Sequence, residues 1–255
     1  MNFNNVKAVI TGGLSGLGKA TSDLIIKNGG RVVIFDLDES NNSKIKTLYK
    51  NNYTIFYGDV TKEDDINKCF KFACDKFREV NLVVNCAGIG VAEKLIGKEG
   101  LHSIALFQKV INVNLFGTFN VIRSALKEMK NNSVDNDGLR GVIINTSSIA
   151  AYDGQIGQVA YSASKGAIVS ITLPMARELA RYGIRVCTIA PGLFETPMLT
   201  GLPEKAQSKL VESTLLPRRL GKPEEYANLV KSIFENNMLN GETIRLDGSI
   251  RLSPK

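Results

Sequence analysis

Short apolar runs alternate along this chain with longer segments in which apolar residues recur every three or four positions. The short runs predict buried strands, and the longer segments predict helices with one apolar face. Strands are expected over residues 6–11, 31–35, 53–57, 82–84, 142–145, 184–189 and 243–246. Helices are expected over 17–27, 39–51, 62–78, 104–129, 159–182 and 223–236, with a kink at Pro174 in the fifth. Such regular alternation is typical of a parallel sheet covered by helices.

A glycine-rich turn separates the first strand from the first helix and reads Thr11-Gly12-Gly13-Leu14-Ser15-Gly16-Leu17-Gly18. Glycine tolerates positive φ and lets the backbone approach a phosphate closely. The N-terminus of the following helix presents unpaired N–H groups and a partial positive charge to a diphosphate. Asp36 ends the second strand, at the spacing expected of an acid that binds the ribose hydroxyls of an adenosine. Together these features predict a dinucleotide site.

Asp36 also bears on which dinucleotide binds. Its carboxylate would repel the 2′-phosphate of NADP. The residues that follow, Leu37, Asp38 and Glu39, include no basic side chain to hold that phosphate. The sequence therefore predicts NAD as the cofactor, and the alternative interpretation of Asp36 is an ordinary loop carboxylate.

The hydrophobic pattern and the glycine turn together predict an α/β fold: a single Rossmann-type doubly wound parallel sheet with strand order 3-2-1-4-5-6-7 and helices on both faces. At 255 residues the chain is expected to form one domain over 1–255. Residues 193–222 have no strong period and are predicted to be the substrate-binding loop region. Residues 89–103 are expected to form a polar connection, and residues 131–140 a disordered loop.

The composition is that of a globular protein, with 44% hydrophobic and 22% charged residues. No run of 18 apolar residues is present, so no membrane span is expected, and the first residues resemble no cleavable signal. Four cysteines without a CxxC pair and one histidine, His102, argue against a metal site, and His102 is expected at the surface. The cysteines lie in or beside apolar segments, which favours buried reduced thiols.

The net charge of +7 is spread along the chain and does not form a cluster. One interpretation is a solvated basic surface. The other is attraction of a polyanionic ligand such as a nucleotide, coenzyme A or RNA, although the chain has no direct nucleic-acid-binding motif.

Further polar or small residues follow the other strands. Asp59 comes after the third strand, where it is well placed to touch an adenine ring. The fourth strand runs into Asn85-Cys86-Ala87-Gly88, whose small side chains would let a flat ring lie against the backbone; a simple strand-end turn is the alternative. Asn114 lies inside an apolar helical segment, where a buried polar side chain needs a partner.

Tyr161 and Lys165 are four residues apart in a predicted helix, so they share one face one turn apart. Two unit charges about 4 Å apart interact by roughly 4 kcal/mol at an effective dielectric constant near 20. A lysine cation could therefore lower the pKa of the tyrosine, normally about 10, by about three units. Such a shift would suit a general acid/base near neutral pH. An exposed Tyr–Lys pair on an ordinary helix is the alternative.

Taken together, the motifs resemble those of the short-chain dehydrogenase/reductase family over essentially the whole chain. The glycine turn, Asp59, Asn114 and the Tyr161–Lys165 pair occur in the family's order. Asn85-x-Ala87-Gly88, Ser148 and Pro191-Gly192 also match in that order, with Ser148 thirteen residues before Tyr161.

The resemblance implies roles for the catalytic residues. Ser148 would hydrogen-bond the substrate oxygen and Tyr161 would exchange a proton with it. Lys165 would lower the pKa of Tyr161 and bind the nicotinamide ribose, so that the active pair is completed when NAD is bound. Asn114 would position a water that links Lys165 to solvent. Ser147 is the rival of Ser148, and the spacing to Tyr161 favours Ser148.

The motifs and the resemblance together imply a set of ligand contacts. Besides Tyr161 and Lys165, the expected cofactor contacts are Gly12, Ser15, Gly16, Leu17, Gly18, Asp36, Asp59, Val60, Asn85, Cys86, Ala87, Gly88, Pro191, Phe194 and Thr196. Gln155 and Gln158 are candidate substrate contacts with Ser148 and Tyr161, and an ordinary polar loop is the alternative for the two glutamines.

Within the family, several stretches resemble a subgroup of NAD-dependent 3-hydroxyacyl-CoA and hydroxysteroid dehydrogenases. These stretches are 117–123, 155–158, 161–166, 188–194 with Thr196-Pro197, 202–205 and 239–242. The family resemblance implies a homotetramer, and the subgroup implies a mitochondrial location; a cytoplasmic location is the alternative. Arg218, Arg219 and Lys222 could meet coenzyme A phosphates or form a solvated turn.

The leading hypothesis is thus an NAD-dependent dehydrogenase that interconverts a secondary alcohol and a ketone, with 3-hydroxyacyl-CoA thioesters preferred and hydroxysteroids as further substrates. An NADPH-dependent 3-oxoacyl carrier-protein or carbonyl reductase is the alternative enzyme, and Asp36 argues against it. A scaffold subunit of a mitochondrial RNA-processing complex, with protein partners, is an alternative from another class. The subgroup is associated with mitochondrial tRNA maturation, and both roles can coexist in one chain.

Overall fold

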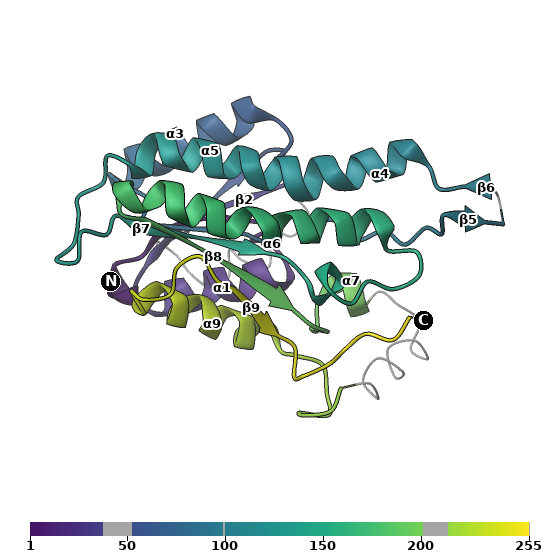
Figure 1. Cartoon of the computed structure of the whole chain (residues 1–255). Coiled ribbons are helices and arrows are strands. Elements are labelled where there is room, and N and C mark those ends of the chain that lie inside the picture. Colours follow the sequence, from purple (N-terminus) through teal and green to yellow (C-terminus); the bar gives the residue numbers. More distant parts are fainter. Residues whose placement is uncertain (38–52, 99, 201–213, 255) are drawn as a thin grey trace.

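A seven-stranded parallel sheet forms the centre of the structure, a computed structural model that describes residues 1–37, 53–98, 100–200 and 214–254 (Figure 1). Its strands are β1 (Lys7–Thr11), β2 (Arg31–Asp36), β3 (Tyr53–Tyr57), β4 (Leu82–Asn85), β7 (Gly141–Thr146), β8 (Ile184–Pro191) and β9 (Thr243–Leu246). They are ordered β3-β2-β1-β4-β7-β8-β9, which confirms the predicted order of the seven strands. The order reverses between β1 and β4, where open α/β sheets bind ligands at the carboxyl ends of their strands.

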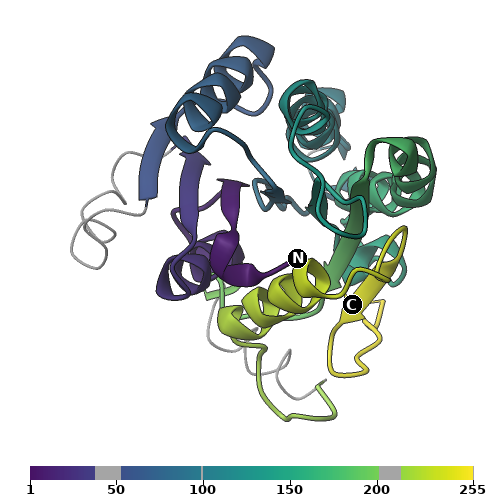
Figure 2. The ribbon, with the colours of Figure 1, turned by 90° about the vertical axis from the view of Figure 1, so that its left-hand side faces the viewer.

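Helices cover both faces of the sheet (Figure 2). The α-helices are α1 (Gly16–Lys27), α3 (Glu63–Phe77), α4 (Ile104–Ile111), α5 (Thr118–Met129), α6 (Val159–Leu179), α7 (Pro197–Thr200) and α9 (Pro223–Glu235). Shorter helical segments are η1 (Phe3–Asn5), η3 (Asn112–Gly117), η4 (Ile149–Ala151) and η5 (Ala180–Tyr182). None of the described helices is both long enough and apolar enough to cross a membrane.

Successive residues of each strand feed two separate cores, because side chains alternate across a sheet. In β1, Ala8 and Ile10 pack in the cluster that contains the apolar face of α9, including Tyr226. Val9 packs in the other cluster, which also contains apolar residues of α3 and α5 such as Phe70 of α3. The near-continuous apolar runs of the strands are explained by this burial on both faces.

The long helix predicted over 104–129 is present, but its middle is π-helical. α4, η3 and α5 follow one another without a break, and η3 is the segment with i→i+5 geometry. Apolar residues spaced three to four positions apart do not reveal one wider turn, so the prediction missed it. Asn114 lies in this π segment and is completely buried, which agrees with the frequent use of π-bulges at functional sites.

The loop over 131–140, predicted to be disordered, is ordered. Asn132 is buried and donates to the backbone oxygen of Val80 at 2.7 Å. The Arg140 guanidinium donates to the Asn132 carbonyl at 2.9 Å. These side chain–backbone bonds carry no periodicity, which is why the hydrophobic pattern did not indicate them.

A second correction concerns the connection over 89–103. It contains an antiparallel hairpin of β5 (Ile96–Gly97) and β6 (Gly100–Leu101), which projects from one end of the molecule (Figure 1).

The α6 helix continues through Pro174 to Leu179 and is followed by η5. The predicted polar helix over 39–51 and residues 201–213 of the predicted substrate loop lie outside the described residues.

Candidate active site

A cavity of about 780 Å³ opens at the carboxyl edge of the sheet. Strand ends and loops that are far apart in the sequence meet there. Of the predicted site residues, those that line it are Gly12, Ser15, Gly16, Leu17, Gly18, Asp36, Asp59, Val60, Cys86, Ala87, Gly88, Ser148, Gln155, Gln158, Tyr161, Lys165, Pro191, Phe194 and Thr196. Two predicted residues, Asn85 and Asn114, do not line it.

The glycine turn has the close packing that a diphosphate cradle needs. Gly12 has φ +64°, and a Cβ there would lie 2.8 Å from the backbone nitrogen of Ala87. A Cβ at Gly18 would collide with the carbonyl oxygen of Gly12. The α1 helix begins at Gly16, and the side chain of its N-cap, Ser15, makes no capping hydrogen bond. The first turn of α1 therefore faces the cavity with a partial positive charge and fits the diphosphate of a dinucleotide.

Asp36 is the last residue of β2 and lies at the other side of this turn. One carboxylate oxygen accepts a hydrogen bond from the backbone of Leu14 at 3.0 Å, and the other accepts one from Leu37 at 2.8 Å. Each oxygen keeps a lone pair for a further donor. The carboxylate therefore both braces the glycine turn and can bind ribose hydroxyl groups.

Asp59 also has a local partner in the loop after β3. Its Oδ1 accepts hydrogen bonds from the backbone nitrogen and the hydroxyl of Thr61, each at 2.8 Å. This Asx-type turn holds the loop at the cavity rim next to Val60, which is buried. The predicted contact between Asp59 and an adenine ring stays a prediction.

Asn85 was predicted as a cofactor contact but its side chain lies within the sheet. It is buried, and its Nδ2 donates to Oδ1 of Asn145 at 2.9 Å. The two asparagines are register partners on β4 and β7, so their side chains meet on the same face. The small residues after it do reach the cavity, where the Thr11 hydroxyl accepts from the backbone nitrogens of Cys86 and Ala87 at 3.2 and 3.1 Å.

Ser148 and Ser147, the two rival serines, have different surroundings. Ser147 is buried and donates its hydroxyl hydrogen to the backbone oxygen of Lys165 at 2.8 Å, so it braces α6. Ser148 is half-buried at the cavity, accepts from the backbone nitrogen of Ala150 at 3.1 Å, and hydrogen-bonds Tyr161. The geometry thus favours Ser148 as the serine that can meet a ligand together with Tyr161.

Lys165 lies beside the ring of Tyr161, one helical turn away on α6. Its Nζ lies 5.8 Å from the centroid of the Tyr161 ring. The same Nζ donates to the backbone oxygen of Thr146 at 2.9 Å. Lys165 is buried, with 6% of its surface exposed, so its ammonium group relies on this carbonyl for solvation.

Burial dominates the acidity of both groups. It raises the pKa of Tyr161 above the usual 10.0, and only the hydrogen bond with Ser148 acts in the opposite direction. Burial also lowers the pKa of Lys165 from 10.5 to about 8, with a smaller opposing effect from Cys86. In the protein by itself the pKa of Tyr161 is thus raised by burial, and the expected lowering of this pKa by Lys165 stays a prediction.

Asn114 satisfies its side chain through protein groups. Its Oδ1 accepts from the backbone nitrogen of Ile89 at 2.8 Å, and its Nδ2 donates to the oxygen of Ile89 and to the hydroxyl of Ser164 at 2.9 and 3.0 Å. A Cβ at Gly88 would lie 3.1 Å from this Oδ1 and 3.5 Å from Nζ of Lys165. Asn114 therefore connects η3 both to the segment after β4 and to α6, close to Lys165. Its expected role in binding a water stays a prediction.

Gln155 and Gln158 line the cavity and are also bound to neighbouring groups. The Gln158 Oε1 accepts from the backbone nitrogen of Gln155 at 3.0 Å. The Gln155 Nε2 donates to the carbonyl of Ser253, almost a hundred residues away, at 2.9 Å. Part of their polarity thus holds the loop in place.

Several cavity residues were not foreseen. Thr146, Lys109 and Leu252 line it, from the end of β7, from α4 and from the C-terminal segment. The Thr146 hydroxyl is 2.7 Å from that of Tyr226, a fully buried residue of α9. The strand pattern could have indicated Thr146, because it precedes Ser147 at a strand end, but no local signal marks Leu252.

The basic and histidine positions have structural partners. Arg219 forms a bidentate pair with Glu225, at 2.9 and 2.8 Å, near the start of α9. His102 is half-buried in the connection after β4, and its Nδ1 lies 2.8 Å from Oε2 of Glu93. All four cysteines are free thiols, and Cys69 and Cys187 are buried as predicted, whereas the other two are partly exposed.

Comparison with known proteins identifies the family to which this fold and site geometry belong. The sequence profile of the family described as short chain dehydrogenase matches residues 6–207. The human protein named 3-hydroxyacyl-CoA dehydrogenase type-2 is 53% identical over 249 residues, which cover 97% of this chain and 95% of that protein.

Two solved structures extend the similarity to three dimensions. A 3-hydroxyacyl-CoA dehydrogenase type-2 from Mycobacterium avium has a TM-score of 0.94 and 35% identity, covering 99% of this chain and 98% of the other. A 3-ketoacyl-(acyl-carrier-protein) reductase from Brucella melitensis, complexed with NADH, has a TM-score of 0.85 and 29% identity, covering 97% and 98%. With the cradle of α1 and the grouping of Ser148, Tyr161 and Lys165, these matches show that the chain belongs to the short-chain dehydrogenase/reductase family and is an oxidoreductase.

Proposed function

We propose that the protein is an NAD-dependent dehydrogenase that interconverts 3-hydroxyacyl-CoA and 3-oxoacyl-CoA thioesters, with hydroxysteroids as secondary substrates. One observation carries this proposal: Ser148, Tyr161 and Lys165 line the same cavity as the glycine turn and Asp36. A nicotinamide cofactor bound along that cavity would bring its reactive end to the three side chains. The names of the relatives support the acyl-CoA substrate class.

In the proposed reduction, the chain's residues act on the oxygen of the ketone. Ser148 donates a hydrogen bond to that oxygen and stabilises the negative charge that develops on it. Tyr161 gives its hydroxyl proton to the same oxygen, and in the oxidation it takes the proton back. The bound cofactor would supply the hydride as NADH in the reduction and accept it as NAD in the oxidation.

Lys165 is proposed to act on Tyr161 once the cofactor is present. Its ammonium group is held by the Thr146 carbonyl at the edge of the cavity, where it can also reach ribose hydroxyls. Closing the cavity over a ligand lowers the local dielectric constant, so the positive charge acts more strongly on the phenolate form. Because burial raises the pKa of Tyr161 in the protein alone, the proposed activation of the pair requires the bound cofactor.

NAD is proposed over NADP because of Asp36. Its carboxylate lies at the cavity with both oxygens already fixed by backbone donors. A 2′-phosphate would face this negative charge, and an NADPH-dependent carrier-protein reductase would need a cation there. Coenzyme A, a polyanion, suits the net charge of +7.

The test follows the loss of NADH absorbance, and in parallel that of NADPH, with acetoacetyl-CoA and with a ketosteroid. Turnover is expected with NADH and acetoacetyl-CoA, and the ketosteroid is expected to react more slowly. Equal or faster turnover with NADPH would overturn the choice of cofactor. No turnover of any acyl-CoA would overturn the substrate class.

The same assay tests the mechanism with Tyr161→Phe, which removes only the hydroxyl. We expect kcat to fall by at least about a thousandfold, while NADH binding measured by fluorescence titration stays within about twofold of wild type. Tyr182→Phe is the matched control and should keep full activity, because Tyr182 lies in η5, after the C-terminal end of α6, and does not line the cavity. Full activity of Tyr161→Phe would rule out its acid/base role.

We also propose that the protein is a homotetramer and that it acts in mitochondria, as the family and subgroup resemblance implies. Apolar side chains exposed on η3 and α5, among them Phe116 and Phe119, support assembly. Detection of the chain in purified mitochondria by a specific antibody would test the location, and its recovery in the cytosolic fraction alone would refute it.

A further inference from the structure

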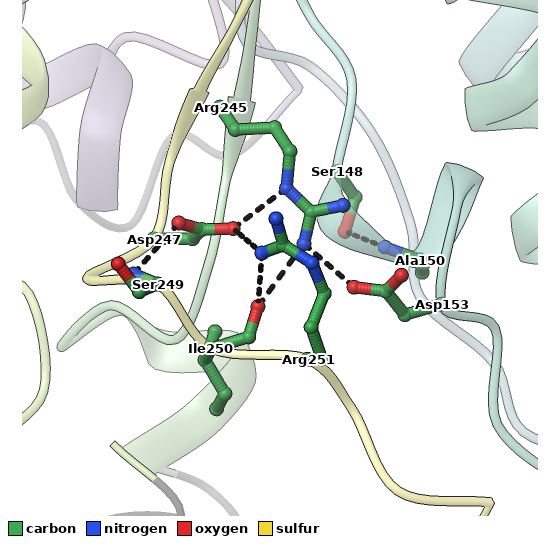
Figure 3. A network of polar contacts seen from close by, with 8 residues as sticks. All are labelled: Ser148, Ala150, Asp153, Arg245, Asp247, Ser249, Ile250 and Arg251. Atoms are coloured by element: carbon green, nitrogen blue, oxygen red, sulfur yellow. Dashed lines mark hydrogen bonds and ion pairs between the residues drawn. The ribbon is translucent and has the colours of Figure 1, made fainter. Parts of the chain in front are cut away.

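The last residues of the chain cross back to the loop that carries Ser148. We call residues 249–254, which follow β9, the C-terminal strap. Arg245, at the end of β9, anchors it: its Nε lies 2.7 Å from the Asp247 carboxylate, and one Nη lies 2.6 Å from the carboxylate of Asp153 (Figure 3). Asp153 follows η4, so one guanidinium joins the turn between β9 and the strap to the Ser148 loop.

The strap is held at several further points. The same Nη of Arg245 that meets Asp153 also donates to the Ile250 carbonyl at 3.1 Å, and Ile250 is 1% exposed. Arg251 donates to the Asp247 carboxylate at 3.3 Å (Figure 3). The Arg245 guanidinium also lies 5.1 Å from the centroid of the Tyr152 ring, which is a cation–π contact. This end of the chain is therefore fixed by charged and apolar contacts together.

Two backbone groups of the strap bind the loop next to the candidate substrate residues. The Ser253 carbonyl accepts from Nε2 of Gln155 at 2.9 Å, and the Pro254 carbonyl accepts from the backbone nitrogen of Ile156 at 3.0 Å. These bonds draw the strap against the stretch between Ser148 and Gln158. Because the strap contributes backbone oxygens to these two bonds, they do not use the side chain of Leu252.

Leu252 is the strap residue that reaches the cavity. It is half-buried and lines the same cavity as Ser148, Ala150, Gln155 and Gln158. Its neighbour Ser253 is fixed to Gln155, so the backbone on one side of Leu252 is held. A leucine in this position presents an apolar side chain to the cavity next to the Gln155 loop.

We propose that Leu252 is a specificity-determining residue that forms part of the wall of the acyl pocket, and that the Arg245–Asp153 ion pair positions this wall. The proposal rests on the proposed 3-oxoacyl-CoA substrates. An apolar wall favours acyl chains that fill the space before it and limits those that are longer. Because the strap is tied to the Ser148 loop, the wall keeps its place relative to the reacting carbonyl.

The first experiment compares kcat/KM for 3-oxoacyl-CoA substrates of four, eight, twelve and sixteen carbons with NADH. Leu252→Ala enlarges the pocket, so we expect the ratio of kcat/KM for long to short chains to rise about tenfold. Leu252→Phe should lower that ratio by a similar factor. Leu101→Ala, at an exposed leucine in β6 that does not line the cavity, is the matched control and should keep the wild-type profile.

The second experiment tests the ion pair as a positioning contact. Asp153→Asn keeps the side-chain shape and removes the charge that faces Arg245. We expect the long-to-short ratio to approach that of Leu252→Ala through changes in KM, with kcat for acetoacetyl-CoA within about threefold of wild type. Asp153→Glu restores the charge and should return the profile to the wild-type one. Circular dichroism and NADH titration confirm that each variant is folded and binds cofactor.

The outcomes separate this inference from the proposed function. If wild type turns over no 3-oxoacyl-CoA, the proposed function fails. If wild type is active and both Leu252 variants keep its chain-length profile, the role of Leu252 is overturned. If the Leu252 variants change the profile and Asp153→Asn does not, the positioning role of the ion pair is overturned.

Discussion

Lys165 occupies a buried position that lowers the stability of the folded protein. Its ammonium group is buried, and its pKa falls from 10.5 to about 8. Between those two pH values the unfolded chain binds the proton more tightly than the folded chain. Ionised Lys165 therefore destabilises the fold, with the full penalty below pH 8 and a diminishing one as pH rises toward 10.5.

We predict that Lys165→Met abolishes turnover and raises the free energy of unfolding at pH 7 by about 1–3 kcal/mol. Urea unfolding followed by circular dichroism at pH 7, 9 and 10.5 measures the effect, and the gain over wild type should shrink at each step. Lys68→Met, at an exposed lysine of α3, is the control and should change stability little at any of these pH values. A constant gain across the pH range would show that burial of the charge is not its cause.

Asp36 provides the second prediction at the residue scale. Asp36→Asn keeps an oxygen that can accept from the Leu14 nitrogen and removes the negative charge. We expect the ratio of kcat/KM for NADPH to that for NADH to rise by about ten- to a hundredfold, because hydrogen bonds to a charged group are worth about 1.5–3 kcal/mol. Steady-state kinetics with both cofactors measure the ratio.

Asp23→Asn is the control for this change. Asp23 lies on α1 and pairs with Lys19, outside the cavity, so its amide should leave the cofactor ratio unchanged. An unaltered ratio in Asp36→Asn would mean that another group selects the cofactor.

At the scale of elements, one arginine closes the end of α9. Arg185, on β8, is 2% exposed. Its two Nη atoms donate to the carbonyls of Ile233, Phe234 and Leu239 at 2.7–2.9 Å. The last carbonyls of a helix have no partner within it, so this guanidinium joins α9 to the sheet.

We predict that Arg185→Met lowers the free energy of unfolding by about 2–4 kcal/mol, because three buried carbonyls lose a charged donor. Equilibrium unfolding in urea measures the loss. Arg177→Met, at an exposed position of α6, should lower it by less than about 0.5 kcal/mol. Equal effects in the two variants would contradict a specific role for the Arg185 contacts.

The elements also show why parts of the site could be predicted. The glycine turn could be predicted because the strand, the turn and the helix follow one another in the sequence, and the local spacing of residues indicates all three. Tyr161 and Lys165 share a helix in the same way. In contrast, the π-helical η3 places Asn114 against Ile89 and Ser164, and no local period specifies that wider turn.

At the scale of the whole molecule, the exposed apolar surface leads to a prediction about assembly. Phe116 and Phe119 are 55% and 43% exposed on neighbouring turns of η3 and α5. We expect light scattering to give four times the chain mass of 27.8 kDa. Phe119→Glu should yield smaller species, since a charge on a buried interface is unfavourable. Val134→Glu, at an exposed site in the loop after α5, should remain tetrameric; a monomeric wild type would refute the assembly.

The sequence by itself determined the strand order, the glycine turn before α1 and the candidate catalytic residues, because each depends on residues close together in the chain or on periodic burial. The tertiary structure decided what depends on distant contacts. It turned Asn85 toward Asn145, gave Lys165 a buried position on the Thr146 carbonyl, and brought Leu252 to the Ser148 loop. Side-chain direction and loss of water depend on neighbours contributed by other elements, and no local pattern encodes them.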